Sequence, residues 1–337
     1  MKRIALDKGA ARATALLGVV ASVLFALATP FSPTVFAQSY PTKPISIVSS
    51  ASPGTSGDAA LRMMTAKMSA SMGQPIVVEL RTAARGAQAY AVVSKAAPDG
   101  HTLTFGTAGT FVYGRFLFKN MAFDILKDYT PVSMSLNSPA YVAIHNSRGI
   151  NTMQELIDYA KKNPGKLEFG STGNGSYFHL AGEALKHAAG VDMLHVPYSQ
   201  ANYPQLQTDF LNGRIAVFVT TWFTVGPNQN RVKTLAVVDR QRSRHLPNVP
   251  IVSDLLPAYE PFVVWWGFFG PVGLPNSIAT RVAAESKAAM LQADVLTRIE
   301  DLGMEVVGST PDELARMLRQ DVEAIGKVVK AIGLQPE

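Results

Sequence analysis

The 337-residue sequence contains no cysteine. Disulfide bonds, thiolate metal ligands, cysteine nucleophiles and a lipid-modified N-terminal cysteine are therefore all excluded. Charged residues are also sparse, at 17%, whereas apolar residues make up 47% of the chain. This balance excludes wholesale disorder and provides for a core of useful size, and the length fits about two domains of roughly 150 residues each.

The first 37 residues have the pattern of a secretory signal peptide rather than of folded structure. A basic start, from Lys2 to Arg12, is followed by an uncharged apolar run at 13–27 and then by the small-residue junction Val35 to Ala37. A membrane anchor is the competing interpretation, but the run is shorter than the ~20 residues that a spanning helix needs. We therefore expect residues 1–37 to be cleaved, leaving an exported chain with a formal net charge of +3.

Several functional motifs are missing from the mature sequence. A mild charge without a basic stripe argues against nucleic acid as a partner. Phosphate-loop, zinc-protease and nucleophile-elbow motifs are absent, and the glycine pair at 173 and 175 has Phe178 where a dinucleotide fingerprint needs a third glycine. We expect no cofactor, no metal ion and no catalytic residue. An exported serine hydrolase that uses His179 or His195 stays open as an alternative, because catalytic triads are assembled from distant positions.

The mature chain alternates between strand-like and helix-like segments, and the pattern occurs twice. In the first unit we predict strands at 45–49, 76–80 and 102–106, with helices from about 58 to 72 and from 86 to 97. In the second we predict strands at 167–170, 193–196, 214–220 and 235–237, with helices ending at 162, starting after 176 and covering 203–211. Thr310 and Pro311 then start a last helix, as a cap and a first-turn proline do.

This order predicts an α/β fold of two domains, each a mainly parallel sheet flanked by helices. Two extended segments, at 132–145 and 262–270, are predicted to cross between the domains as a hinge. The first domain would then be discontinuous. We expect domain 1 to comprise residues 38–140 and 265–337, and domain 2 to comprise residues 141–264.

The strongest functional signal is a loop of Gly, Ser and Thr between a strand and a helix. It occurs at 53–58 and 171–176, and in a weaker form at 107–110. Free backbone N–H groups and the helix dipole make such a helix start a site for a carboxylate or a phosphate, and small residues let the ligand approach. One loop in each domain predicts an anion site in the cleft between them. Two ordinary turns without a ligand are the competing interpretation.

The candidate ligand-binding residues lie in these loops or beside them. In domain 1 they are Ser52, Pro53, Gly54, Thr55, Ser56, Asp58, Arg85, Thr107, Gly109 and Thr110. In domain 2 they are Ser171, Gly173, Asn174, Gly175, Ser176, His179, Tyr198 and Trp222. Arg85 would pair with an anion through its guanidinium, unless it is a solvated loop arginine. His179 falls one turn into its helix, where it would hydrogen-bond the loop or the ligand, or be a structural histidine.

A set of short motifs runs through the mature chain from Tyr40-Pro41-x-Lys43-Pro44-Ile45 to the last helix. The most specific is Ser171-x-Gly173-Asn174-Gly175-Ser176-x-x-His179-Leu180-Ala181-Gly182-Glu183. Further motifs are Gly73 to Glu79, Ala97 to Leu103, His195 to Tyr198, Leu246 to Pro250, and Gly308 to Pro311. With these motifs the chain resembles the Bug-type extracytoplasmic solute-binding proteins of tripartite tricarboxylate transporters.

The resemblance implies a periplasmic binding protein of type II-like, Venus-flytrap architecture that closes on its ligand. It implies a small organic carboxylate held largely by backbone amides of two facing loops, often with bridging water. It also implies that a monomer is recognised by the membrane subunits of a tripartite tricarboxylate transporter. A periplasmic sensor that presents the ligand to a membrane receptor kinase shares the binding step and stays open as an alternative.

The chain departs from this family at three places. Thr55 and Ser56 stand where two of three glycines usually follow the first loop's proline, so only Gly54 is kept. The usual Asn-Arg-Pro-Gly-Ala-Gly-Gly stretch is here 80–86, which loses glycines and adds Arg85. Ala216 replaces a common acid. We therefore expect a narrower cleft, a different grip in domain 1 and a ligand unlike citrate.

Overall fold

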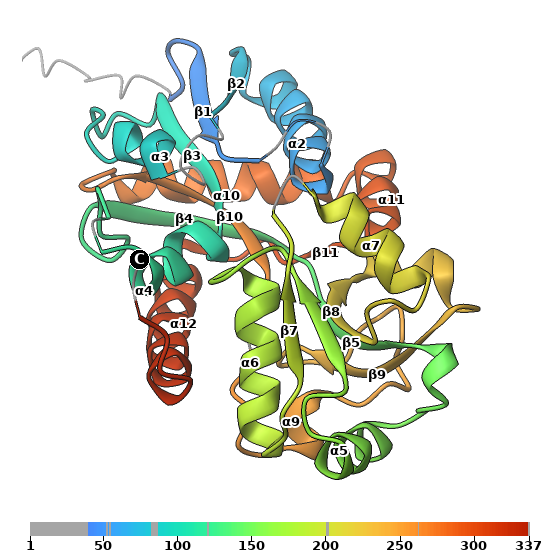
Figure 1. The fold of residues 1–337 in the computed structure, drawn as a ribbon. Helices are drawn as coiled ribbons and strands as arrows, with labels where there is room; N and C mark the ends of the chain where they lie inside the picture. Colours follow the sequence, from blue (N-terminus) through green and yellow to red (C-terminus); the bar gives the residue numbers. More distant parts are fainter. Residues whose placement is uncertain are drawn as a thin grey trace, which may run out of the picture. The chain divides into compact units, whose positions relative to one another are not determined.

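The computed structural model describes residues 40–51, 53, 55–81, 87–119, 121–199, 202–261 and 263–335 (Figure 1). The predicted signal peptide at 1–37 lies outside these ranges, as do three candidate site residues, Ser52, Gly54 and Arg85. Within the described ranges, no helix combines the length and the apolar character that crossing a membrane requires.

The first sheet has six strands in the order β11-β4-β10-β3-β1-β2. Its strands are β1 (Ile45–Ser49), β2 (Ile76–Leu80), β3 (Thr102–Thr107), β4 (Tyr129–Asn137), β10 (Trp265–Pro271) and β11 (Glu305–Val306). The helices that follow or flank them are α2 (Ser56–Met72), α3 (Ala87–Val93), α4 (Gly114–Leu117), α10 (Asn276–Met290), α11 (Ala293–Asp301) and α12 (Pro311–Ala331). A short π-helix, Gly109–Tyr113, follows β3.

The second sheet has five strands in the order β7-β6-β8-β5-β9. Its strands are β5 (Ala140–His145), β6 (Glu168–Ser171), β7 (Leu194–Pro197), β8 (Val217–Thr221) and β9 (Val232–Val238). The associated helices are α5 (Met153–Lys162), α6 (Tyr177–Ala189), α7 (Tyr203–Leu211), α8 (Trp222–Val225) and α9 (Val252–Leu255). Figure 1 shows α6 of this sheet beside α12 of the first, and the two helices are in contact.

The α/β class and the two sheets with flanking helices are confirmed, but the sheets are mixed rather than mainly parallel. The parallel strand pairs are β2-β1-β3 in one sheet and β7-β6-β8 in the other. The remaining strands pair antiparallel. The physical reason is the connection: β4 to β5, and β9 through the short α9 to β10, carry the chain from one sheet to the other, so these strands do not return over a helix to a parallel neighbour in the same sheet.

The crossing from β4 to β5 passes through Ser138, whose N–H donates to the carbonyl of Val264 at 2.7 Å. Val264 itself lies just before β10, so the two crossing segments are hydrogen-bonded to each other. Asn137 adds a bond from Nδ2 to Oδ2 of Asp239, 2.8 Å away, at the end of β9. The segments expected to connect the two units therefore meet, whereas the predicted domain boundaries stay a prediction.

The predicted apolar stripe of α2 forms part of the core. Leu61, Met64, Met68 and Met72 are all buried, and they pack with Ile47 and Phe105 of the sheet. The last helix begins as predicted: the Thr310 side chain accepts from the N–H of Glu313, and the Glu313 carboxylate accepts from the N–H of Thr310. This capping box satisfies two amides at the helix start that have no intrahelical acceptor.

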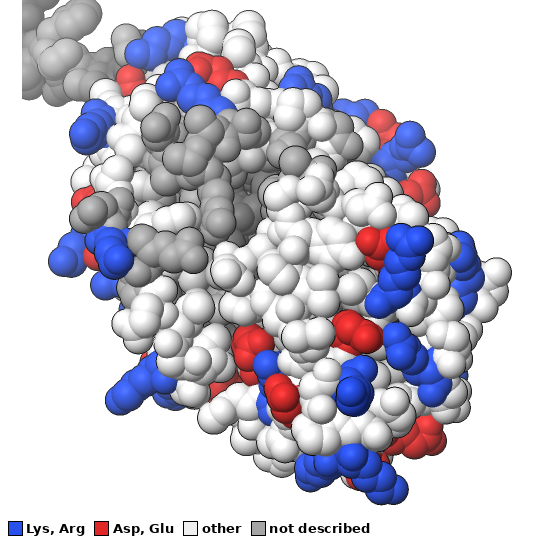
Figure 2. Space-filling model, in the orientation of Figure 1, with Lys and Arg blue, Asp and Glu red and all other residues white. Residues whose placement is uncertain are grey.

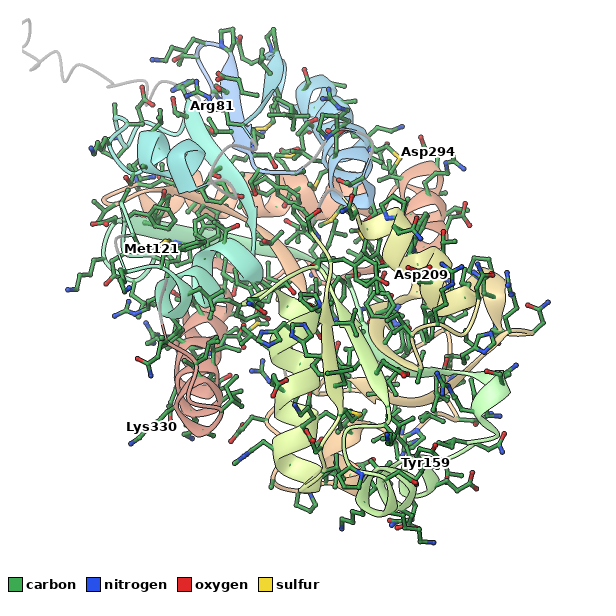
Figure 3. All side chains as sticks on the ribbon, viewed as in Figure 1. Arg81, Met121, Tyr159, Asp209, Asp294 and Lys330 are labelled. Carbon is green, nitrogen blue, oxygen red and sulfur yellow. The ribbon has the colours of Figure 1, made fainter. Side chains whose placement is uncertain are left out.

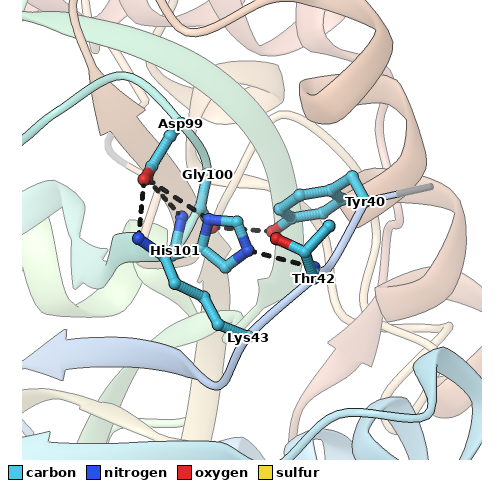
Figure 4. Close-up of polar contacts among 6 residues, drawn as sticks. All are labelled: Tyr40, Thr42, Lys43, Asp99, Gly100 and His101. Atoms are coloured by element: carbon cyan, nitrogen blue, oxygen red, sulfur yellow. Dashed lines mark hydrogen bonds and ion pairs between the residues drawn. The ribbon is translucent and has the colours of Figure 1, made fainter. Parts of the chain in front are cut away.

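The first described residues are tied to the turn that precedes β3 (Figure 4). Tyr40 donates its hydroxyl to the carbonyl of Gly100 at 2.7 Å, and Lys43 pairs with Asp99 at 3.0 Å. The N–H of Thr42 donates to Nε2 of His101 at 3.3 Å. Two motifs that are far apart in the sequence, at 40–45 and 97–103, are thus one structural feature that holds the start of β1 beside β3.

Candidate functional site

The topology brings the predicted loops to one edge of each sheet. In the first sheet β1 lies between β2 and β3, and in the second β6 lies between β7 and β8. The connections that leave β1 and β3 run to opposite sides of the first sheet, and those that leave β6 and β8 do so in the second. Ligands of open α/β sheets bind at such switch points, at the carboxyl ends of the strands. The loops after β1, β3, β6 and β8 lie at these two switch points. They contain most of the residues predicted to bind a ligand.

The loop after β6 has a backbone that only glycine adopts easily. Gly173 and Gly175 have φ angles of 110° and 71°, in the region where a Cβ is strained. The Gly173 N–H donates to Oγ of Ser171 at 3.1 Å, and the Gly175 N–H donates to Nδ1 of His179 at 3.0 Å. We expected these amides to face a ligand, but both are used inside the loop. Within the described part of the chain, the Asn174 N–H donates to no acceptor.

The side chains of His179 and His195 contact this loop and each other. Ser171 Oγ is 2.7 Å from Nε2 of His195, and the His179 and His195 ring centroids are 4.3 Å apart. His195 also stacks on Phe169, its neighbour in the parallel register of β6 and β7, at 4.8 Å. The hydrogen bond from His179 to the loop is one of the roles that its sequence position predicted. His195 was not among the predicted ligand-binding residues.

The environment keeps both imidazoles neutral near pH 7. Burial lowers the pKa of His179, and the Lys186 charge adds to this effect while Glu183 opposes it. Burial, followed by the charges of His179 and Lys186, lowers the pKa of His195 to about 4. Nδ1 of His179 carries no proton when it accepts from Gly175, so the neutral form is also the one that the loop geometry requires.

The first turn of α2 forms the corresponding edge of the first sheet. Thr55 is the N-cap residue, but its side chain makes no capping bond. The Ala59 N–H donates to the Thr55 carbonyl at 2.9 Å. The Ser56 and Gly57 N–H groups donate to no acceptor among the described residues. Ser56 is partly exposed and Gly57 is buried, and N–H groups without an acceptor at a helix start attract an anion.

Asp58 lies in the same first turn and is 5% exposed. Its carboxylate pairs with Nε of Arg62, one turn further along α2, at 2.8 Å. An acid in the first turn stabilises the helix through its dipole, so Asp58 has a structural role whether or not it also reaches a ligand. Pro53 is exposed at the same loop.

The loop after β3 turns directly into the short π-helix. Thr107 Oγ1 accepts from the Thr110 N–H at 3.4 Å, and it would lie 3.3 Å from a Cβ on Gly109. The Thr107 side chain therefore folds back over the start of the helix. Thr110 is 8% exposed, so the loop offers little polar surface beyond Thr107 and the backbone.

The loops after β3 and β6 touch each other. A Cβ on Gly175 would lie 2.8 Å from Cδ2 of Leu117, in the helix that follows the β3 loop. Tyr113 of the same segment stacks on Tyr177, the first residue of α6, with centroids 6.0 Å apart. The carboxyl edge of the second sheet therefore contacts the helical segment 113–117 that follows the β3 loop, whereas a facing pair made by the 53–58 and 171–176 loops stays a prediction. The loop after β1 has no such contact among the described residues.

Tyr198 and Trp222 are placed differently from each other. The Tyr198 carbonyl would lie 3.1 Å from a Cβ on Gly173, and its hydroxyl donates to Asp209 at 2.8 Å. Figure 3 shows Asp209 on α7. Tyr198 thus packs beside the 171–176 loop. Trp222 stacks on His245 at 4.3 Å and packs against Gly226 and Gly303, so much of its ring is already covered by protein.

Trp266 is a residue of this edge that the sequence did not predict. It is the second residue of β10 and pairs with Thr107, at the end of β3. Its ring stacks on Phe105 with centroids 5.6 Å apart and an interplanar angle of 15°. A Cβ on Gly57 would lie 2.4 Å from its Cζ2. The Trp-Trp doublet at the start of a predicted crossing strand was the available signal.

The site loops contain no lysine or arginine between 49 and 61, 105 and 114, or 169 and 182. Arg81, which follows β2, pairs with Glu79 at 2.9 Å on the surface. Figure 2 shows charged side chains of both signs distributed over the drawn face, without a patch of one sign. Within the described ranges there is also no group of three His, Asp or Glu residues arranged to hold a metal. The donors in these loops are therefore neutral.

Comparison with known proteins gives one family. Residues 60–334 match the model of the "Tripartite tricarboxylate transporter family receptor". A UPF0065 protein in the tcbD-tcbE intergenic region of Pseudomonas sp. (strain P51) is 31% identical over 315 residues, which are 92% of this chain and 93% of that protein.

Two solved structures are similar to this chain. R. palustris Rpa4515 with adipate is 26% identical, with a TM-score of 0.74, and the match covers 88% of this chain and 100% of that one. MatC from Rhodopseudomonas palustris with bound malate is 29% identical, with a TM-score of 0.70, and the match covers 86% of this chain and 100% of that one.

Proposed function

We propose that this chain, which belongs to the tripartite tricarboxylate transporter receptor family, captures one small organic carboxylate in the periplasm and delivers it to a membrane transporter. Family membership confirms the resemblance drawn from the sequence motifs and makes the chain a solute-binding protein of the TctC and Bug type. The ligand class, the transporter partnership, the export of the chain and the absence of catalysis belong to the proposal.

The observation that carries the proposal is the set of neutral donors at the two sheet edges. The Ser56 and Gly57 N–H groups lie at one edge, the Asn174 N–H lies at the other, and each lacks an acceptor among the described residues. A carboxylate accepts several such hydrogen bonds at once and gains further from the dipole of α2. Relatives solved with adipate and with malate support the same ligand class.

Capture would proceed by closure of one unit over a ligand held by the other. The predicted domains, 38–140 with 265–337 and 141–264, meet at the crossing segments, where Ser138 is bonded to Val264. Few residues need to change conformation for such a hinge. Closure removes water from the amide–carboxylate bonds and so strengthens them. The basic and apolar pattern of residues 1–37 supports export to the periplasm.

A hydrolase is the second candidate, because Ser171 and His195 are 2.7 Å apart. Two features favour a structural pair over a nucleophile and its base. Ser171 is 0% exposed, and its Oγ already accepts the Gly173 N–H. A substrate carbonyl would have to enter the loop to be attacked. A periplasmic sensor differs from the proposal only in its membrane partner.

Calorimetry with a panel of mono- and dicarboxylates tests the binding step. We expect one class to bind with one-to-one stoichiometry and to be recovered unchanged after long incubation, as followed by proton NMR. Appearance of a product would support the hydrolase. Deletion of the gene should abolish uptake of the bound compound, whereas normal uptake with a lost transcriptional response would support the sensor. If no carboxylate binds, the proposal is wrong.

A further inference from the structure

Trp265 and Trp266 have opposite environments at the start of β10. Trp265 is buried, and its Nε1–H donates to Asp321 at 2.8 Å. Trp266 points to the other face, as alternation along a strand requires, and it is partly exposed. Its partner in the register is Thr107, the last residue of β3. Its side chain therefore lies at the carboxyl end of β3, beside the switch point of the first sheet.

The Trp266 ring is held in one orientation. Phe105 stacks against it nearly in parallel, at an angle of 15°. The six-membered ring lies against the first turn of α2, where a Cβ on Gly57 would be 2.4 to 2.9 Å from three of its atoms. Glycine at 57 therefore allows the indole to lie against the helix start. A ring packed on two sides loses little rotamer freedom when a ligand covers its remaining surface.

The indole N–H of Trp266 is a further hydrogen-bond donor beside the first turn of α2. Within the described part of the chain, Nε1–H of Trp266 has no hydrogen-bond acceptor, and neither do the neighbouring Ser56 and Gly57 amides. Trp266 and Ser56 are partly exposed, so water satisfies their donors, whereas Gly57 is buried under the ring. A ligand oxygen that replaces the water keeps the hydrogen bonds, and the ring surface beside them removes apolar ligand surface from water.

We propose that Trp266 contacts the ligand directly and selects carboxylates that have an apolar body. This inference rests on the proposed function and names the ligand class more closely. The indole surface covers C–H groups of the ligand, and Nε1–H donates to a carboxylate oxygen. A hydroxylated or densely charged molecule such as malate or citrate would place polar groups against the ring, and the loops at 49–61, 105–114 and 169–182 hold no lysine or arginine to balance them. Adipate and benzoate offer a carboxylate next to apolar surface.

Calorimetry of four probes tests this assignment: adipate, benzoate, malate and citrate. The wild-type protein should bind adipate or benzoate at least tenfold more tightly than malate and citrate. Trp266→Phe keeps the apolar surface and removes the donor, and we expect a loss of about fivefold, which is typical of one neutral hydrogen bond. Trp266→Ala should lose more than tenfold and should level the preference between the probes. Tyr159→Phe, on the exposed surface of α5 (Figure 3), is the control for removing a polar group from an aromatic ring.

Tryptophan emission gives a second readout, because the chain has 3 tryptophans. The better-bound probe should change the emission of the wild type, and Trp266→Phe should lose most of that change. Thermal unfolding checks that both variants are folded, and Trp266→Phe alone carries the test if the alanine variant is not. Wild-type affinity in the phenylalanine variant with unchanged emission response, or a wild-type preference for malate or citrate, would overturn the inference and leave capture intact. Failure of every carboxylate to bind would overturn both.

Discussion

Gly175 donates its backbone N–H to Nδ1 of His179, 3.0 Å away and one turn into α6. This bond joins the loop to the helix that follows it, while Ser171 and His195 hold the other end of the loop. The 171–176 loop is therefore held by the side chains of Ser171, His179 and His195 in addition to its own turn, in which the Ser176 N–H donates to the Gly173 carbonyl at 3.1 Å. It is shaped before a ligand arrives, which lowers the entropy cost of binding.

Replacing His179 by leucine should weaken both the fold and ligand binding. The buried Gly175 N–H would lose its acceptor, at a cost of about 1–3 kcal/mol in the free energy of unfolding. Asparagine is the matched control, because its side-chain oxygen can occupy the position of Nδ1 and accept the same bond. Urea denaturation should give the order wild type, then asparagine, then leucine. Equal stability of the leucine and asparagine variants would contradict this role.

Stability should fall as the pH is lowered through the range in which the histidines titrate. The pKa of His195 is lowered to about 4 in the folded protein, whereas an unfolded histidine titrates near pH ~6.5. The unfolded chain therefore binds more protons than the folded chain between these values, and stability is lost as the pH falls from about 6.5 towards 4. Above about pH 6.5 the stabilisation that comes from the lowered pKa of His195 is present in full.

His195→Gln should flatten this dependence, because glutamine can face Ser171 without titrating. The buried acids Asp239 and Asp321 have pKa values raised mainly by burial and titrate with the opposite sign, so the comparison is between variant and wild type at each pH. Denaturation midpoints at pH 7, 6, 5 and 4.5 would measure it. Parallel curves for the two proteins would show that His195 does not cause the loss.

Much of the fold follows from local signals. The strands at 45–49 and 76–80 were predicted with the bounds that the structure has, because short apolar runs there end at loop-forming residues. The Thr310 cap was equally local. Strand direction was not, because the orientation of β4 and β10 depends on where the chain re-enters after crossing between sheets. The residue pattern within β4 or β10 does not indicate in which direction the strand runs in the sheet.

The sequence predicted which loops form the candidate site, but it did not predict most of the hydrogen bonds within them. The hydrogen bond between His179 and its own loop follows from helix spacing. The amides of Gly173 and Gly175 were expected to be free, but Ser171 and His179 accept from them, and loop composition does not reveal such pairing. Trp266 was missed because its partner Thr107 is far away in the sequence. The list of ligand-binding residues as a whole stays a prediction.

Asp321 should be important for the connection between the sheets. It lies on α12, 6% exposed, and accepts from Arg240 at 2.6 Å and from Nε1 of Trp265 at 2.8 Å. Asp321→Asn would leave the Arg240 guanidinium without its charge partner. We expect a loss of about 2 kcal/mol or more in unfolding free energy, below the 3–5 kcal/mol of a fully buried pair because Arg240 is partly exposed.

A double-mutant cycle separates the interaction energy of Arg240 and Asp321 from any other destabilisation of α12 by the substitutions. Arg240→Gln combined with Asp321→Asn removes both charges and should recover part of the single-variant loss, since no charge is then left unpaired. Urea denaturation of the four proteins gives the coupling energy. Strictly additive losses would mean that Arg240 and Asp321 do not stabilise the protein as a pair.

Gly175→Ala should destabilise the protein for two separable reasons. The φ of 71° is unfavourable for alanine, and its Cβ would lie 2.8 Å from Cδ2 of Leu117. Gly73→Ala is the matched control, because Gly73 has a φ of 72° with no atom within 4 Å of the added carbon. The control should lose about 1 kcal/mol, and Gly175→Ala should lose more. Adding Leu117→Ala should remove the part of the Gly175→Ala loss that exceeds the loss of Gly73→Ala, and it should bring no such recovery to the Gly73 variant. If both glycine variants lose the same amount, the 171–176 loop is not in the close contact with Leu117 of α4 that the structure describes.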